Sequence, residues 1–370
     1  MKLATVRLPH RSTHAIGERV HERPPRASDA HERRGKPEAG GKDGRALQFR
    51  SVLVPLDGSK AAEHALPWAL DVASRAGGYI RLVHVHSVPQ ANSKRWPIID
   101  WGAYGDGERK LHQEYLVGVA ERISRTSPVP VASLLLEGSN VAEAIADAAR
   151  TADIVVMAAR RRGAMGRLFH GSVVTQLLQR TTLPLLIAPG YNFPVERAKS
   201  KSIERMLIPL DGSEESETIL DAAAELSSLT AAERTLIRVV PLLPYAGVPW
   251  AEKEDEALSY LNRIAVKLRG QPSAVHTEIV SSDNALGEVL LANAQASRVD
   301  LIAVTSRRGG GPWERFKRSP ANYLIGRSHV PVLVVRATPR RTRQDSFNVA
   351  HELHKLQEAE AGMSSILNGK

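Results

Sequence analysis

Two groups of residues in this chain follow predicted strands at the sheet edge where open α/β folds bind their ligands. The first is Asp57, which follows the uninterrupted apolar run Val52–Leu56 and is followed directly by Gly58 and Ser59. The second is the loop 158–173, which contains several glycines and runs into a helical pattern. Glycine lets the backbone approach a phosphate closely, and the free N–H groups at a helix start attract anions. The loop therefore indicates a binding site for an anion, and Asp57 is expected at the same edge of the sheet.

The end of that loop is its most specific part. Gly171, Ser172 and Val173 would present their N–H groups at the positive end of the following helix. The hydroxyl of Ser172 could add a hydrogen bond to a bound phosphate. Its alternative role is that of an ordinary N-cap, and the sequence leaves both roles open.

Other chemistry is poorly represented. The chain has neither a P-loop nor a Gly-x-Ser-x-Gly elbow, and no Gly-x-Gly-x-x-Gly follows either first strand. It has no cysteine, which excludes an iron–sulfur cluster and a cysteine nucleophile. His84 and His86 share one face of a predicted strand, with no carboxylate or third histidine beside them in sequence. We expect these two histidines to face solvent or to be hydrogen-bonded, and we predict no metal site.

An internal repeat shows which elements must position these residues. The eight residues 52–59 recur as 206–213, with six identical positions at an offset of 154. A second match relates residues 183–187 to residues 330–334 at an offset of 147. Two matches in the same order and at nearly one offset indicate a duplicated domain, because solenoid repeats have much shorter periods.

Each half alternates strands and helices. In the first half we expect strands and helices in the following order: Val52–Leu56 (strand), a helix from Ser59 with Pro67 kinking or delaying it, Ile80–Val85 (strand), Glu108–Thr126 (helix), Val131–Leu136 (strand), Val141–Arg150 (helix), Ile154–Met157 (strand), Ser172–Arg180 (helix) and Pro184–Ala188 (strand). The second half repeats this order as far as Val335. Such alternation predicts an α/β fold with two tandem, open, doubly wound domains, each a five-stranded parallel sheet flanked by helices.

A strand ending in Pro-x-Asp-Gly-Ser, a late loop ending in Gly-Ser-Val and a last strand led by proline resemble the universal stress protein family, in its tandem form. In that family, nucleotide-binding members carry Gly-x2-Gly-x9-Gly-Ser/Thr after strand four. They hold ATP with that loop, with the aspartate after strand one and with backbone at the end of strand two. In this chain the resemblance implies a nucleotide site made of Pro55, Leu56, Asp57, Val85, Ala158, Arg161, Gly171, Ser172 and Val173.

The first half keeps part of that pattern and the second half keeps less. Ala158 and Arg161 stand where the family has its first two glycines, and Arg161 adds a long side chain where backbone should touch phosphate. The second half has Thr305, Arg308, Arg318 and Ser319 at the corresponding positions, so none of the three glycines remains. Pro320 also removes one N–H, so that Ser319-Pro320 has the form of a structural helix start. We expect weak or vestigial ATP binding in the first domain and none in the second.

The second half keeps Asp211 although it lacks the phosphate loop. Turn formation is therefore the alternative role of Asp57.

The basic charge belongs mostly to the first residues. The chain of 370 residues has a net charge of +10, of which residues 1–50 contribute +6 from 12 Lys/Arg and 6 Asp/Glu. That stretch has few large apolar residues, which predicts a disordered basic arm over residues 1–47. No apolar run approaches the roughly 18 residues of a membrane helix, so we expect no integral membrane association.

The expected organisation is a basic arm (1–47), a first domain (48–190), a linker (191–202), a second domain (203–337) and a tail with a helix (338–370). The leading hypothesis is a non-enzymatic, cytoplasmic stress-response protein whose domains pack as an internal pseudo-dimer, with a homodimer left open. One alternative is polyanion or nucleic-acid binding through the arm and the arginine clusters at 160–162, 307–308 and 340–343. The other is an adenine-nucleotide hydrolase, ranked last because no general base or metal set accompanies Asp57.

Overall fold

A computed structural model describes residues 48–87, 101–159, 173–189, 202–242, 250–268, 273–307 and 319–337, with only the backbone course given for 101–105 and 250–252. The expected basic arm, most of the linker and the tail with its helix lie outside these residues, as does most of the loop after strand four. Within the described ranges, no helix combines the length and the apolar character needed to cross a bilayer.

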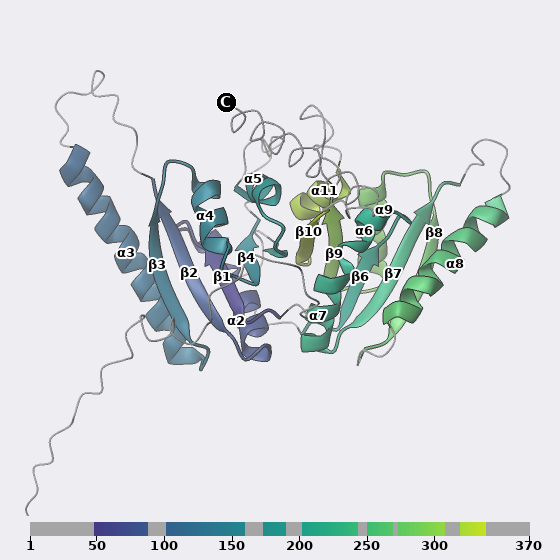
Figure 1. Cartoon of the computed structure of the whole chain (residues 1–370), viewed down its shortest axis with the longest axis horizontal. Helices are drawn as coiled ribbons and strands as arrows, with labels where there is room; N and C mark the ends of the chain where they lie inside the picture. The colour runs from purple at the N-terminus through teal and green to yellow at the C-terminus, as the bar shows by residue number, and fades with distance from the viewer. Residues whose placement is uncertain are drawn as a thin grey trace, which may run out of the picture. The chain divides into compact units, whose positions relative to one another are not determined.

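The first half is a parallel sheet with helices on both faces (Figure 1). Its strands follow the order β3-β2-β1-β4-β5 across the sheet. The strands are β1 (Ser51–Pro55), β2 (Tyr79–His86), β3 (Val131–Glu137), β4 (Ile154–Ala158) and β5 (Leu185–Ala188). The helices are α1 (Lys60–Glu63), α2 (Leu66–Arg75), α3 (Trp101–Thr126), α4 (Val141–Ala149) and α5 (Val173–Arg180). The predicted α/β fold is confirmed, and α3 begins seven residues earlier than expected (101 against 108).

The second half repeats this arrangement with the order β10-β9-β6-β7-β8. Its strands are β6 (Arg205–Pro209), β7 (Glu233–Val240), β8 (Val275–Ser281), β9 (Leu301–Ser306) and β10 (Val332–Arg336). Its helices are α6 (Glu214–Glu217), α7 (Leu220–Thr230), α8 (Trp250–Leu268), α9 (Leu286–Ala296) and α11 (Pro320–Arg327). The duplication read from the sequence is therefore a duplication of the whole strand and helix order.

The last strands of the two halves pair with each other. β5 and β10 run antiparallel, with Ile187 opposite Val332 and Leu185 opposite Val334, whereas every other pairing in the sheet is parallel. In the described residues the two halves thus form one continuous ten-stranded sheet. This pairing removes two sheet edges that would otherwise be open to other chains.

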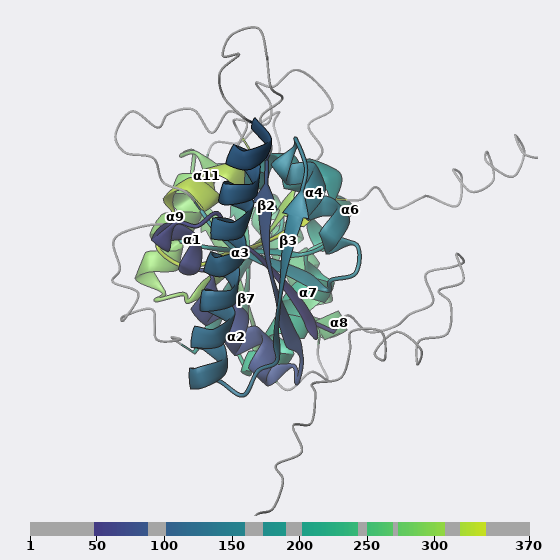
Figure 2. The ribbon, with the colours of Figure 1, turned by 90° about the vertical axis from the view of Figure 1, so that its left-hand side faces the viewer.

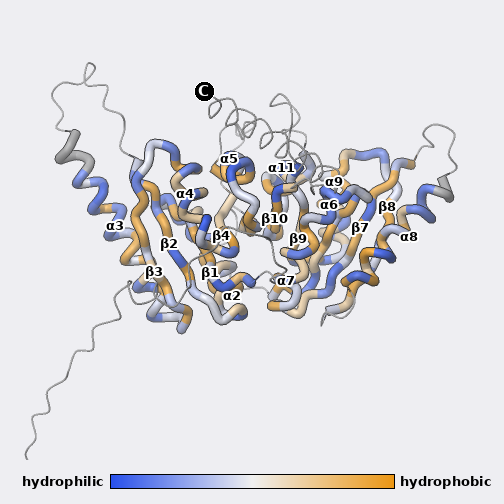
Figure 3. Tube along the Cα trace, in the orientation of Figure 1, coloured by the Kyte–Doolittle hydropathy of each residue, from blue (hydrophilic) through white to orange (hydrophobic). Residues whose placement is uncertain are grey.

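Successive residues of a strand point to opposite faces of the sheet, and both faces are covered here. In β1, Val52 and Val54 pack in the core beneath α2 and α3, while Leu53 packs in the core beneath α4 and α5. Figure 2 shows α3 lying along the strands β2 and β3, and Figure 3 shows that the strands are mostly apolar. Burial on both faces explains why β1 has no polar interruption.

The first helical segment of each half is broken in two. Ser59 caps α1, because its hydroxyl accepts a hydrogen bond from the N–H of Ala62, as predicted. The longer helix α2 begins only at Leu66, with Pro67 in its first turn. Proline is tolerated there because the first-turn N–H groups have no helical partner. The second half has the same break between α6 and α7 with Asp221 at the position of Pro67, so Pro67 fits the start of the long helix but is not needed for the break.

Candidate functional site

The residues predicted to hold a nucleotide lie where β1, β2 and β4 end, at the carboxyl edge of the first-half sheet. Pro55 of β1 is in register with Val83 of β2, and the N–H of Leu56 donates to the Val83 carbonyl over 2.8 Å. Asp57 and Val85, each two residues further along its strand direction, are therefore at the same level. Pro55 and Leu56 are buried, Val85 is half-buried and Asp57 is exposed.

The other side of β1 faces β4. Leu53 is in register with Val155, so Leu56 and Ala158 come to the same level at the end of these strands. Val173 begins α5, the helix that follows the predicted phosphate loop. In open α/β sheets ligands bind at this edge, where neighbouring connections leave in opposite directions. Three predicted residues lie outside the described part of the chain: Arg161, Gly171 and Ser172.

The carboxylate of Asp57 organises the turn that follows it. Its Oδ1 accepts hydrogen bonds from the N–H of Ser59 over 3.0 Å and from the Ser59 hydroxyl over 2.5 Å. Gly58 between them has φ +81°, a left-handed conformation that favours glycine. Ser59 in turn caps α1. Asp57 thus shapes the edge of the site whether or not it touches a ligand.

The second half has the same turn. Asp211 Oδ1 accepts from the N–H of Ser213 over 3.0 Å and from its hydroxyl over 2.6 Å, and Ser213 caps α6. This repetition supports the role of both aspartates in turn formation. It is independent of the glycine loop, which the second half has lost.

Arg307 distinguishes the second half. Its guanidinium forms an ion pair with Asp211, its Nε lies 3.8 Å from Glu215 Oε2, and its Nη2 donates to Ser213 Oγ over 3.4 Å. A basic side chain thus covers the carboxyl-end turn of β6. Because Arg307 is paired with two carboxylates, its charge is already balanced by the protein's own acids. The other positions compared in this half, Arg308 and Arg318, lie outside the described residues.

The start of α11 also fits a structural role. Pro320 occupies the first turn, and the side chain of Ser319 makes no capping hydrogen bond. Thr305 donates its hydroxyl to the carbonyl of Ser216 over 3.1 Å, so this side chain ties β9 to α6. Thr305 and Pro320, which stand at the positions of the nucleotide loop and the helix after it, therefore have structural roles in the second half.

The expectation that His84 and His86 face solvent is wrong. Both are buried, with relative exposures of 6% and 2%. A third histidine, His112 of α3, packs between them: its ring centroid is 4.1 Å from that of His84, and its Nδ1 is 3.3 Å from His86 Nδ1. The alternative that the strand histidines are hydrogen-bonded is correct for His86. His112 was missed, although it lies four residues before the buried Leu116 on the inner face of α3.

The environment of His84 disfavours a positive charge on its imidazole. Burial lowers the pKa of His84 below its usual value, and the neighbouring His112 acts in the same direction. The opposing effect of Asp57, which raises the pKa, is smaller. Among the described residues, no group of three or more His, Cys, Asp and Glu side chains is arranged to hold a metal ion.

A hydrogen-bonded glutamate lies beside the cluster and was also missed. Tyr115 of α3 donates to Glu63 Oε1 over 3.2 Å, and Arg122 Nη2 lies 2.5 Å from Glu63 Oε2. Burial raises the pKa of Tyr115 above its usual value, and Glu63 adds to the effect. The apolar spacing of α3 could have indicated that Tyr115 faces inward, but nothing in the sequence paired it with Glu63.

Comparison with known proteins gives consistent results. A model of the universal stress protein family matches residues 48–189 and 202–336. A universal stress protein of Mycolicibacterium smegmatis is 27% identical over 295 residues, which cover 77% of this chain and 96% of that protein. One from Mycobacterium tuberculosis is 26% identical over 295 residues, with the same shares of 77% and 96%.

Solved structures show the same fold. A universal stress protein from Archaeoglobus fulgidus superposes with a TM-score of 0.62 at 22% identity, covering 79% of this chain and 98% of that chain. A putative universal stress protein from Pseudomonas aeruginosa gives a TM-score of 0.52 at 14% identity, covering 79% and 95%. At these identities the likeness concerns the fold of the two halves.

Proposed function

The chain belongs to the universal stress protein family as a tandem member, and from this premise we propose that its first half binds an adenine nucleotide weakly while its second half binds none. The protein would act in a stress response as a binding protein and not as an enzyme. The two halves would work as an internal pair through the β5–β10 pairing.

One observation carries the nucleotide proposal. The register of β1 with β2 and β4 brings Asp57, Val85 and Ala158 together at the carboxyl edge of the first-half sheet. These are three of the positions through which the family's nucleotide-binding members hold ATP. The site would be weak because Ala158 and Arg161 replace glycines that let the backbone approach phosphate.

Contacts within the second half support the proposal that this half binds no nucleotide. Arg307 holds the carboxylate of Asp211 and Pro320 lacks the N–H that a phosphate would use. A nucleotide entering there would have to displace an ion pair formed with Asp211 and Glu215. We therefore propose that this half has exchanged nucleotide binding for internal contacts.

The proposed absence of catalysis follows from the role of the aspartates. Asp57 and Asp211 make the same two hydrogen bonds to the serine two residues later. Because the second half keeps both hydrogen bonds without the phosphate loop, turn formation explains them. Incubation with ATP should release no phosphate above the background of the Asp57→Asn variant, and release that this variant abolishes would contradict the proposal.

The matched pair Asp57→Asn and Asp211→Asn tests the binding proposal. Asparagine keeps an oxygen for the Ser59 or Ser213 N–H and removes the charge. Calorimetric titration with ATP should show a several-fold loss of affinity in D57N and unchanged affinity in D211N. At a nucleotide concentration ten times Kd, the wild type should gain about 1.4 kcal/mol of stability. Absence of any heat or thermal shift at millimolar ATP would contradict nucleotide binding, and an equal loss in both variants would contradict the assignment to the first half.

A further inference from the structure

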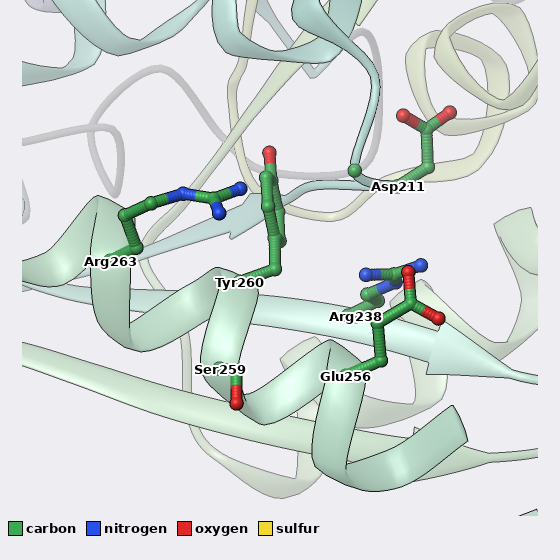
Figure 4. Close-up of a pocket in the computed structure, with 7 residues that line it drawn as sticks. Asp211, Arg238, Glu256, Ser259, Tyr260 and Arg263 are labelled. Carbon is green, nitrogen blue, oxygen red and sulfur yellow. The ribbon is translucent and has the colours of Figure 1, made fainter. Parts of the chain in front are cut away.

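A cavity of about 260 Å³ lies in the second half between the turn after β6 and the helix α8 (Figure 4). Asp211 and Gly212 from the turn, Arg238 from β7, and Glu256, Tyr260 and Arg263 from α8 are among the residues that line it. Arg263 is exposed, whereas Arg238 is half-buried and Tyr260 is only 5% exposed. The cavity therefore has a buried inner wall and a rim that reaches solvent.

Two guanidinium groups are held against one ring in this cavity. The Cζ atoms of Arg238 and Arg263 each lie 5.5 Å from the centroid of the Tyr260 ring, which the close-up shows between them (Figure 4). Stacking of an arginine on an aromatic face restricts where its N–H groups point. The ring itself is fixed, because the Tyr260 hydroxyl lies 3.3 Å from Glu217 Oε1. The protein thus places two positive charges at the cavity before any ligand arrives.

The two acids that line the cavity, Asp211 and Glu256, form no ion pair with Arg238 or Arg263. In the part of the chain that the structure describes, no carboxylate oxygen lies within 4.0 Å of the guanidinium nitrogens of Arg238 or Arg263. The carboxylate of Asp211 is already paired with Arg307. Glu256 stands on the exposed rim, where water screens its charge.

The equivalent place in the first half is filled. Tyr115 and Tyr260 correspond, since each donates to the glutamate that ends the short first helix of its half. In the first half the rings of His84 and His112 stack 4.1 Å apart beside Tyr115. Imidazole rings thus occupy the volume that is open in the second half.

Three changes create the cavity and its charge. The repeat offset of 154 places Arg238 at the position of His84, and the tyrosine pair sets an offset of 145 between α3 and α8. By that offset, Ala257 replaces the ring of His112 and Arg263 replaces Gly118. Two of these changes remove an imidazole ring and two add a guanidinium group, so the second half exchanges packed imidazoles for an open basic cavity.

Gly212 keeps the cavity open on the side of the turn. It has φ +90°, and a Cβ at this position would lie 3.3 Å from Arg238 Cζ. A larger residue would therefore strain the turn and press on the guanidinium group.

We propose that this cavity binds a small oxyanion, with a phosphate group held between Arg238 and Arg263. Guanidinium N–H pairs match phosphate oxygens in a bidentate arrangement, and two such groups suit a doubly charged anion. The volume accommodates a phosphate and a small attached group. This site lies on the α8 side of the second half and does not depend on nucleotide binding by the first half.

Titration of the full chain with inorganic phosphate at fixed ionic strength tests the proposal, and ribose 5-phosphate tests whether a phosphomonoester is preferred. Arg263→Gln removes an exposed guanidinium and should weaken phosphate binding at least fivefold without changing the thermal midpoint. Arg238→Gln should weaken it at least tenfold. Arg125→Gln, which removes an exposed arginine from the first half, is the matched control and should change nothing.

Binding of either probe that is lost in R263Q and kept in R125Q supports the site, and the tighter probe identifies the ligand's form. Phosphate affinity that is unchanged in R263Q, or reduced equally in R125Q, would overturn the proposal. The variant D57N separates the two sites. Phosphate binding through Arg263 should persist in it, even where ATP binding fails.

Discussion

Tyr115 donates a hydrogen bond of 3.2 Å to Glu63, and this contact joins the outer helix α3 to the short helix α1. The second half repeats the contact between Tyr260 and Glu217 at 3.3 Å. Each glutamate also faces a basic side chain from the same outer helix, Arg122 in one half and Lys267 in the other. The duplication has therefore kept an interior polar contact as well as the fold.

Replacing Tyr115 by phenylalanine removes this hydrogen bond and keeps the ring. We expect Y115F to lower the free energy of unfolding by about 1 kcal/mol, because Glu63 keeps Arg122 and some access to water. The equivalent change Tyr260→Phe should cost a similar amount. Urea unfolding of both variants measures the effect, and a loss confined to one half would show that the two contacts are not equivalent.

The buried imidazole of His84 predicts a pH dependence. Burial and His112 lower its pKa in the folded protein, so below the usual value of 6.5 the unfolded chain binds the extra proton more readily. This contribution to stability is present above pH 6.5 and falls progressively as the pH drops from there toward the lowered folded pKa. The ionisable groups that act on His84 are His112, Asp57 and His86, and a backbone hydrogen bond with Leu56 also raises its pKa.

The variant His84→Gln should therefore lose less stability than the wild type between pH 7 and pH 5. Thermal midpoints across this range measure the slope. The matched control is His276→Gln, which removes an exposed imidazole from the second half. If H84Q and the wild type have the same slope, His84 does not carry the acid sensitivity.

Gly78 is required by close packing of backbone. A Cβ there would come within 2.0 Å of the carbonyl oxygen of Arg50, which accepts the N–H of Tyr79 at the start of β2. We expect Gly78→Ala to destabilise the protein by about 3 kcal/mol, at the upper end of the cost of overpacking. The control Gly107→Ala adds a methyl group to α3 with no atom within 4 Å and should stabilise it by about 0.5–1 kcal/mol. Chemical denaturation of both variants checks the opposite signs.

The pairing of β5 with β10 should be essential to stability. Leu186 of β5 is fully buried and is in register with Leu333 of β10. We expect Leu186→Ala to cost about 2–5 kcal/mol. The control Leu111→Ala changes a residue that is 64% exposed and should shift stability by less than about 0.5 kcal/mol. Comparable losses in both variants would contradict a tightly packed pairing.

The sequence determined the features that depend on neighbours along the chain. Asp57, Ser59 and Ala62 are joined by hydrogen bonds that span two or three residues, so the turn and the cap could be predicted from their types alone. The order of strands and helices along the chain followed from the alternation of buried strands with helices and from the repeat. The departures at Ala158 and Arg161, and the loss of glycine in the second half, are also sequence facts that the fold does not alter.

The tertiary structure decided which distant side chains meet. His112 reaches His84 and His86 only because α3 packs on β2 in one particular register, and Arg307 reaches Asp211 across 96 residues of chain. The periodicity of apolar residues indicates which face of a helix is buried. It does not indicate where along the strands the helix is placed. The basic cavity of Arg238 and Arg263 depends on where α8 is placed along β7. It could therefore not be recognised before these two elements were packed together.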